Sequence, residues 1–274
     1  MVCWCRQWKG TSDMVKQKAS VALAGALLLL LQGSAFAQPD MSALPPGYLA
    51  RDQLPDSLAL LPPPPEPGSA AFARDEEVSR ETTVPPESER WKQAASDADL
   101  HPPHIFQAFS CALGFTPDAK ATPALYRLLG RMAIDVGLST YKAKNHYQRT
   151  RPFVAHEGRT CFPPDEAMLR KDGSYPSGHS ALGWGWALVL TEIDPQRDDA
   201  ILQRGRDFGV SRMVCNAHWA SDVDAGRQIA AATVARLHAD PAFTADLAAA
   251  RTEIAAIANR HDASCPVSAP VPAD

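Results

Sequence analysis

The chain has 274 residues, of which 45% are hydrophobic, and a formal net charge of −4 at pH 7. A chain of this length and composition can bury a full core in one domain. Its acidic balance argues against nonspecific binding to nucleic acid, which depends on clustered Lys and Arg. We therefore expect one globular domain and no nucleic-acid partner.

The first 37 residues have the three parts of a secretory signal peptide. Lys16 and Lys18 precede an apolar run over 19–31, and Ala35-Phe36-Ala37 then places small residues before the predicted cleavage site. The run is shorter than the span of about 20 residues that crosses a bilayer. We expect a periplasmic or secreted protein, cleaved after Ala37 and without membrane insertion thereafter. An uncleaved anchor is the alternative.

Met14 is a candidate for the true start of the chain, because the leader that begins there is compact. Four basic residues and one acidic residue lie within the first 37. Their removal takes the net charge from −4 to −7, so the predicted mature chain is more acidic still.

Four cysteines remain after the predicted cleavage, at positions 111, 161, 215 and 265. An even number in an exported chain predicts two disulfides, and three pairings of Cys111, Cys161, Cys215 and Cys265 are possible. Their spacings contain no Cys-x-x-Cys pair, so we do not expect a structural zinc site.

Residues 38–71 form a proline-rich arm, with four consecutive prolines at 62–65 and another at Pro67. Proline fixes φ and removes a backbone donor, so the arm is predicted to be extended rather than helical. Several of its leucines make it too apolar for a free tail. They are Leu54, Leu58, Leu60 and Leu61. We expect the arm to pack across the domain or a neighbouring subunit.

From Phe72 onward the pattern is helical. Thr122-Pro123 is typical of an N-cap followed by proline in the first turn, and apolar residues then recur at three- and four-residue steps. Further helices are predicted over 180–193, 198–214, 218–239 and 241–258. Period-two alternation is scarce, and we find no repeat or second domain. The sequence predicts an all-α fold, with one helical domain over 72–261 and a tail over 262–274.

Three short segments carry complementary chemistry: together they supply three cations, two histidines, a carboxylate and a glycine turn. The segments are Lys144 with Arg151-Pro152, then Pro176-Ser177-Gly178-His179, then Ser211-Arg212 with His218 and Asp222. Each alone is compatible with a solvated helix face, a loop boundary or a helix start. The ordered set predicts a site that holds phosphate and moves it onto a nitrogen.

Five residues are predicted to bind the phosphate group. Lys144, Arg151 and Arg212 would neutralise its oxygens, since arginine offers a planar fork and lysine a compact charge. Ser177 would donate its hydroxyl, and Gly178 would let a backbone N–H approach at the start of a helix, where unpaired N–H groups favour anions.

His218 is the predicted nucleophile. Asp222 follows four residues later, on the same face of a helix, and would orient the imidazole. His179 is the predicted general acid. With ordinary pKa values near ~6.5, two such histidines predict a bell-shaped rate profile on the acid side of neutrality. The other histidines are predicted to be structural or solvated, with His146 the exception because it lies near Lys144; their spacing predicts no metal site.

At these residues the chain resembles the type 2 phosphatidic acid phosphatase superfamily, and within it the bacterial class A nonspecific acid phosphatases. The segment 173–180, Gly-Ser-Tyr-Pro-Ser-Gly-His-Ser, is close to the signature of that class, with Ser180 where threonine is common. Leu60-Leu61 followed by four prolines is a second class feature. The likeness covers about 54–254. A slightly short stretch at 137–141 puts the substrate preference in doubt.

The resemblance implies an all-helical fold of the acid phosphatase and vanadium-dependent haloperoxidase type. It also implies secretion to the periplasm, hydrolysis of a broad range of phosphate monoesters and no required metal or cofactor. A phosphohistidine would form on His218, with Asp222 orienting it and His179 as the acid. Family members often form homo-oligomers, and some transfer phosphate to nucleosides or other alcohols.

Three alternatives stay open from the sequence. Vanadate-dependent haloperoxidases share the cations and the histidines, so the same residues permit an oxidoreductase. A non-catalytic protein that binds phosphate or vanadate is a second alternative. Membrane lipid phosphatases of the same superfamily are disfavoured, because this chain has one short apolar run. The motif residues contact the phosphoryl group and therefore do not identify the physiological substrate.

Overall fold

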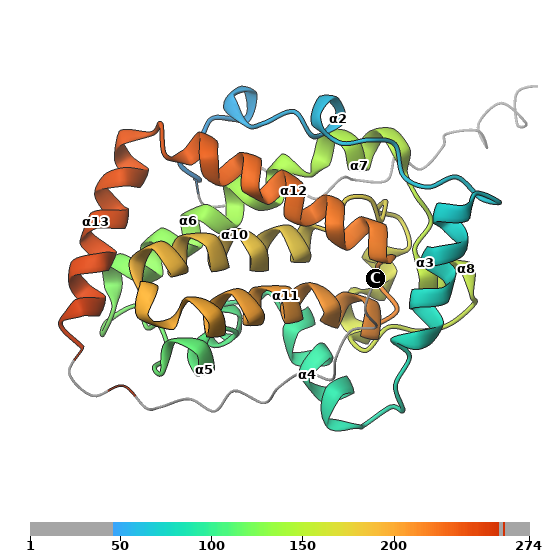
Figure 1. Ribbon diagram of the computed structural model, residues 1–274, viewed down its shortest axis with the longest axis horizontal. Helices are drawn as coiled ribbons and strands as arrows, with labels where there is room; N and C mark the ends of the chain where they lie inside the picture. Colours follow the sequence, from blue (N-terminus) through green and yellow to red (C-terminus); the bar gives the residue numbers. More distant parts are fainter. Residues whose placement is uncertain (1–45, 258–259, 261–274) are drawn as a thin grey trace, which may run out of the picture. The chain divides into compact units, whose positions relative to one another are not determined.

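The computed structural model describes residues 46–257 and residue 260, and the secondary structure of these residues is helical (Figure 1). Short 3-10 helices, labelled η, lie between the α-helices. The elements are η3 (Arg51–Gln53), α2 (Ser57–Leu60), α3 (Ala70–Glu81), α4 (Glu89–Ala98), η4 (His104–Gln107), α5 (Ser110–Leu113), α6 (Pro123–Ser139), α7 (Tyr141–Tyr147), α8 (Pro152–Ala155), η5 (Pro163–Asp165), α9 (Glu166–Leu169), α10 (Gly178–Ile193), η6 (Pro195–Arg197), α11 (Asp198–Val214), α12 (Ala220–Leu237) and α13 (Pro241–Ala255). The predicted all-α fold is confirmed. The predicted signal peptide and tail lie outside the described residues.

The helix α10 lies at the centre of the domain, where it packs against α6, α11 and α12 (Figure 1). Its residues are apolar on every side, which is the pattern of a helix surrounded by others. Trp186 is 1% exposed and its ring packs against those of Phe106 and Phe109 in the main core. Because α10 begins at Gly178, this packing fixes the position of the predicted phosphate-binding segment.

α10 begins at Gly178, two residues before the apolar run over 180–193 and where Ser177 and Gly178 were expected to open the helix. The Ser177 side chain caps it by accepting the N–H of Ser180 at 3.2 Å. α12 begins two residues late, at Ala220, because the Asp222 carboxylate accepts the backbone N–H of Trp219 at 2.9 Å. His218 therefore precedes α12, and the expectation that it shares a helix face with Asp222 was wrong.

The proline-rich arm is partly helical, which corrects the expectation of a wholly extended segment. Residues 62–66 have no helix, as expected, but Ser57–Leu60 forms one short turn. Asp56 caps this turn by accepting the N–H groups of the second and third residues after it. A polar cap and the absence of proline between Ser57 and Leu61 explain the turn.

The arm packs across the domain through backbone contacts and two of its leucines. The buried Asp135 carboxylate of α6 accepts the N–H of Tyr48 at 2.7 Å and of Leu49 at 3.0 Å. Further along, Leu61 is buried and Leu54 is partly buried in the core. The other two leucines expected to pack, Leu58 and Leu60, are exposed by 38% and 57%.

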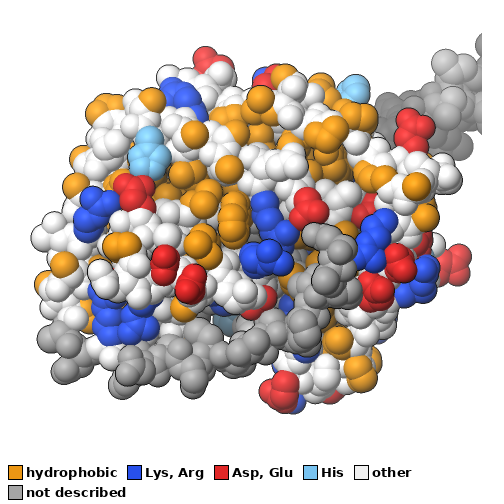
Figure 2. All heavy atoms as spheres, in the orientation of Figure 1, with side chains coloured by type: hydrophobic (Ala, Val, Ile, Leu, Met, Phe, Trp, Pro, Cys, Tyr) orange, Lys and Arg blue, Asp and Glu red, His pale blue; other side chains and the backbone are white. Residues whose placement is uncertain are grey.

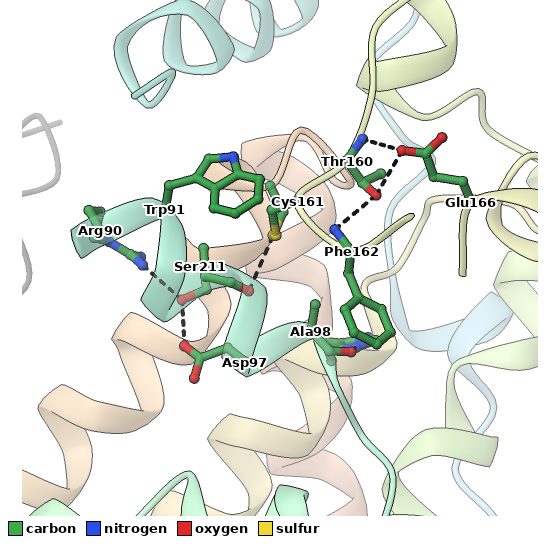
Figure 3. Close-up of a disulfide and its surroundings, with 12 residues drawn as sticks. Arg90, Trp91, Asp97, Ala98, Thr160, Cys161, Phe162, Glu166 and Ser211 are labelled. Carbon is green, nitrogen blue, oxygen red and sulfur yellow. Dashed lines mark hydrogen bonds between the residues drawn. A yellow bond between two sulfur atoms is a disulfide. The ribbon is translucent and has the colours of Figure 1, made fainter. Parts of the chain in front are cut away.

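One disulfide joins Cys161 to Cys215, with 4.8 Å between their Cα atoms (Figure 3). Cys215 is the residue that ends α11, and Cys161 follows α8, so the bond ties two of the three motif segments together. Cys161 lies beside Trp91 of α4. The pairing left open by the sequence is settled for this pair. Cys111 is also disulfide-bonded.

The surface carries both signs of charge. On the face shown in Figure 2, Lys and Arg side chains are interspersed with Asp and Glu side chains. Among the residues that the structure describes, no helix has both the length and the apolar character needed to cross a membrane. The cations of the three motif segments are not part of this surface, because they are buried.

Two glycines allow the motif segments to approach one another. A Cβ on Gly226 of α12 would lie 2.5 Å from the carbonyl oxygen of Ser177. A Cβ on Gly173 would lie 2.9 Å from the carbonyl oxygen of Lys144. Neither position accepts a side chain unless the backbone of a predicted site residue moves.

Replacing Gly226 by alanine is expected to lower the free energy of unfolding by about 1–3 kcal/mol, because the methyl group overpacks against the backbone at Ser177. The matched control is Gly137→Ala in α6, where a Cβ meets nothing within 4 Å. The control should be neutral or stabilising by up to about 1 kcal/mol. Urea unfolding measures both, and equal effects would contradict the packing argument.

Candidate active site

The cations of the first segment lie against backbone carbonyl groups in the loop before α10. The Lys144 Nζ donates to the Gly173 carbonyl oxygen at 2.6 Å. The Arg151 guanidinium donates to the carbonyl oxygens of Asp172, Gly173 and Ala217 at 3.0, 3.2 and 3.1 Å. Carbonyl groups accept hydrogen bonds but carry no net charge. The two cations are 3% and 2% exposed, and these carbonyl groups hold them without neutralising their charge.

The turn between α11 and α12 brings Arg212 next to His218. Asn216 adopts a left-handed conformation with φ 56°, which reverses the chain after α11. The backbone N–H groups of Ala217 and His218 then both donate to the Arg212 carbonyl oxygen, at 3.0 and 3.2 Å. The five-residue spacing between Arg212 and His218 is thus the length of a helix end and one tight turn.

Backbone and side-chain hydrogen bonds hold the three segments together. The N–H of Phe153, two residues after Arg151, donates to the Asn216 carbonyl oxygen at 2.9 Å. The N–H of Ser177 donates to the Asp222 carbonyl oxygen, also at 2.9 Å. The indole N–H of Trp219 donates to the Thr150 carbonyl oxygen at 2.8 Å. Residues distant in the sequence are therefore fixed relative to one another to within hydrogen-bond lengths.

The imidazole of His218 faces the cations with its Nε2 atom, which accepts a hydrogen bond from Arg151 Nη1 at 2.9 Å. A guanidinium is always a donor here, so Nε2 carries the lone pair and Nδ1 carries the proton of the neutral ring. Burial lowers the pKa of His218 well below its ordinary value, and Arg151, Lys144 and Arg212 lower it further. The lone pair is therefore available in acidic solution.

Asp222 lies behind the His218 ring and is fully buried. Its Oδ2 atom is 3.4 Å from His218 Nδ1, which is longer than a hydrogen bond but close enough for strong attraction to a positive ring. Its neighbour Asp224 is by contrast a surface acid, with a side chain that is 66% exposed.

His179 lies at the start of α10, where its Nε2–H donates to the Ala98 carbonyl oxygen at 3.1 Å. This bond leaves Nδ1 as the nitrogen that can exchange a proton. Burial lowers the pKa of His179 well below its ordinary value, and Arg212 lowers it further. The expectation of an unperturbed pKa for His179 and His218 is thus corrected, because both rings are partly or fully withdrawn from water beside cations.

Among the three motif cations, Arg212 has the fewest hydrogen-bond partners within the described residues. Its side chain is 2% exposed, and its Nε and Nη1 atoms have no hydrogen-bond partner among the described residues. Burial, and then the charge of Arg151, lower the pKa of Arg212 to about 9. The same two causes lower the pKa of Lys144 to about 8. Buried donors without acceptors cost stability, so this arrangement favours a bound anion.

Ser177 and Gly178 provide donors beside these cations. The Ser177 oxygen accepts hydrogen bonds from the N–H and the hydroxyl of Ser180, at 3.2 and 2.9 Å. With these two bonds accepted, the Ser177 hydroxyl can donate its hydrogen to an anion. Gly178 begins α10, where the first N–H groups lack partners within the helix and face its positive end.

Three charged residues that the sequence did not assign also belong to this region. The Asp172 carboxylate accepts from Arg151 Nη2 at 3.0 Å and lies 3.5 Å from Lys144 Nζ. Arg149 donates to Asp222, and Asp75 of α3 pairs with Arg149. Arg149 lies in a basic stretch, residues 139–156, which contains four Lys and Arg residues and no acid, and this composition was a signal in the sequence. Asp172 and Asp75 showed none, because only the fold brings them near.

His146 does not join the site, since its ring lies edge-on against Tyr147. Trp186 and Trp219 are buried, and Trp184 is partly buried. No group of three or more His, Cys, Asp and Glu side chains within the described part of the chain is arranged to hold a metal ion.

Arg212→Met is expected to leave the free energy of unfolding in phosphate-free buffer unchanged or higher, because it removes a buried charge with unpaired donors. The same change should weaken binding of inorganic phosphate by about tenfold to a hundredfold, the worth of one charged hydrogen bond. Urea unfolding and calorimetric titration measure the two effects.

The matched control is Arg204→Met on the same helix. Arg204 pairs with the buried Asp97, so its loss should cost about 3–5 kcal/mol of stability. A large loss of stability in Arg212→Met with phosphate affinity intact would show that Arg212 has a structural role instead.

Comparisons with known proteins agree on one family. A model of the PAP2 superfamily matches residues 124–243. The non-specific acid phosphatase of Providencia stuartii is 44% identical over 241 residues, which cover 84% of this chain and 97% of that protein. The non-specific acid phosphatase of Salmonella typhimurium is 46% identical over 195 residues, covering 71% and 78%. An acid phosphatase of Zymomonas mobilis is 42% identical over 199 residues, covering 73% and 75%.

Proposed function

Because this chain belongs to the PAP2 superfamily and is a bacterial-type acid phosphatase, we propose that it hydrolyses a broad range of phosphate monoesters through a phosphohistidine on His218. The observation that carries the proposal is the direction of the His218 lone pair. Nε2 lies 2.9 Å from Arg151 Nη1, in the field of two further cations. A phosphoryl group held by those cations is in reach of that nitrogen.

In the first step, the Nε2 lone pair of His218 attacks phosphorus and a P–N bond forms. The bond from phosphorus to the leaving oxygen breaks, and its electron pair remains on that oxygen. His179 gives its Nδ1 proton to the same oxygen, so an alcohol departs. Arg151, Arg212 and Lys144 stabilise the three equatorial oxygens throughout.

In the second step, water attacks phosphorus and the P–N bond breaks. The electron pair of that bond returns to Nε2 of His218. The neutral His179 ring accepts a proton from the attacking water, which restores both histidines and releases phosphate. Asp222 contributes between the two steps, because its charge behind Nδ1 stabilises the positive phosphorylated ring.

Export and phosphoryl transfer belong to the same proposal. The first 37 residues support secretion to the periplasm with cleavage after Ala37. An alcohol or a nucleoside that replaces water in the second step would receive the phosphate. A homo-oligomer is proposed from the resemblance. A panel of phosphate monoesters, assayed with a chelator and with a nucleoside as acceptor, tests breadth, metal independence and transfer together.

Rapid acid quench of the wild-type enzyme with a radiolabelled ester should trap phosphate bound to protein, stable to alkali and labile to acid. His218→Ala should lose both the label and turnover, because the nitrogen that would carry the phosphoryl group is gone. His179→Asn should trap more label from an aryl ester, since that leaving group needs little protonation while the second step loses its base. The control His146→Ala should match wild type, and label that survives in His218→Ala would sink the proposal.

The pH profile is expected to depend on whether the ester is bound. Activity falls as pH rises through the pKa of His179, because the acid must be protonated. Burial and Arg212 lower that pKa in the protein alone, while a bound dianion brings negative charge that raises it. The alkaline limb of kcat should therefore lie at higher pH than that of kcat/KM. Coincident limbs, or limbs unchanged in His179→Asn, would contradict the assignment of His179.

A further inference from the structure

Behind Asp222, two further charged side chains form a buried bridge that the reaction steps do not use. Arg149 donates from Nη1 to Asp222 Oδ1 at 2.6 Å and from Nη2 to Asp75 Oδ2 at 2.7 Å. The three side chains are between 0% and 8% exposed. Buried ion pairs contribute little net stability, since desolvation offsets their attraction. The bridge therefore calls for a reason beyond stability.

The bridge also fixes the first turn of α12 to α3. Asp75 accepts the N–H of Ser221 at 2.9 Å and its hydroxyl at 2.6 Å. The Arg149 guanidinium lies near the rings of Trp219 and Phe72, at 5.5 and 6.0 Å from their centroids. Arg149 is thus held by two carboxylates and flanked by two aromatic rings, so it has one position.

Arg149 and the backbone N–H of Trp219 set the orientation of the Asp222 carboxylate. Its Oδ1 atom takes the short bond from Arg149, and its Oδ2 atom takes the N–H of Trp219 at 2.9 Å. The contact from Oδ2 to His218 Nδ1 is longer, at 3.4 Å. His218 therefore meets a carboxylate that other groups have already placed.

We propose that Arg149 and Asp75 are positioning residues for the transfer to His218: Arg149 holds the Asp222 carboxylate behind the imidazole, and Asp75 balances the charge of Arg149. The inference rests on the proposed function of His218. Arg149 and Asp75 together are neutral, so the full negative charge of Asp222 remains available to the phosphorylated ring.

The charges around His218 predict the direction in which each substitution should shift the pKa of its ring. Three cations face the ring: Lys144 from α7, Arg151 from the residue before α8, and Arg212 from α11. His179 faces it from α10. Asp222 faces it from α12. Removing Arg149 leaves two carboxylates behind the ring and favours protonated His218. Removing Asp75 leaves Arg149 to offset Asp222 and favours the neutral ring.

The experiment compares Arg149→Gln with Asp75→Asn in the full-length enzyme. The measurement is the acid limb of kcat/KM for an aryl phosphate, where activity is lost as His218 becomes protonated. The limb should move to higher pH in Arg149→Gln and to lower pH in Asp75→Asn, each by on the order of one pH unit. A purely structural role would lower activity at every pH without opposite shifts.

Two matched controls remove the same charges from the surface. Lys142→Gln takes one positive charge from the same basic stretch, and Asp224→Asn takes one negative charge from α12. These side chains are 60% and 66% exposed, so solvent screens them from the site. Both controls should leave the limb where it is in the wild type.

Arg149→Lys separates charge from geometry. It keeps the positive charge, so the limb should stay within a few tenths of a pH unit of wild type. It lacks the planar fork that spans two carboxylates, so kcat should fall about tenfold. Circular dichroism checks folding in each variant. If Arg149→Gln does not fold, the acid limbs of Asp75→Asn and Arg149→Lys still test the proposal.

A second readout does not need turnover. An NMR titration of the His218 imidazole, assigned by its loss in His218→Gln, should show the same opposite shifts in pKa. Unmoved titrations, or shifts in one direction for both variants, overturn the inference. Failure of the proposed function looks different: the wild type would give no phosphorylated protein, whereas the NMR shifts would still report the bridge.

Discussion

The structure depends on gathering three cations where water hardly reaches them. Lys144, Arg151 and Arg212 are each no more than 3% exposed, and the charge of Arg151 lowers the pKa values of the other two. Most of the acceptors around Arg151 are backbone carbonyl groups, which hold a guanidinium without cancelling its charge. A region built in this way is strongly positive and has buried donors to spare, and that is what a phosphoryl group requires.

The fold gathers these cations by holding backbone carbonyl groups in place as well as side chains. The oxygens that hold the cations come from the loop before α10 and the turn after α11, and both are anchored to packed helices. Gly226 lets α12 come close to the start of α10. The histidines are tuned by the same surroundings, because withdrawal from water beside cations lowers their pKa values.

Much of this could be predicted from the sequence because it is local. Apolar spacing located the long helices, and the three motif segments named residues that the fold places around the His218 ring. The outer charges could not be predicted, since Asp75 and Asp172 meet their partners only through tertiary packing. Capping moved the start of α12 past His218, because the Asp222 carboxylate bonds the Trp219 N–H instead of extending the helix. Histidine pKa values likewise depend on burial, which spacing does not reveal.

The disulfide shortens the covalent route between two residues that meet in the candidate active site. Arg151 and His218 are 67 positions apart along the chain. Arg151 lies ten residues before Cys161, and His218 lies three residues after Cys215, so the route across the sulfur atoms is far shorter. Loop-closure entropy grows with the logarithm of length, so this shortcut reduces the cost of their encounter by about 1.4 kcal/mol. In the oxidised chain, a contact of high sequence separation has become a nearly local one.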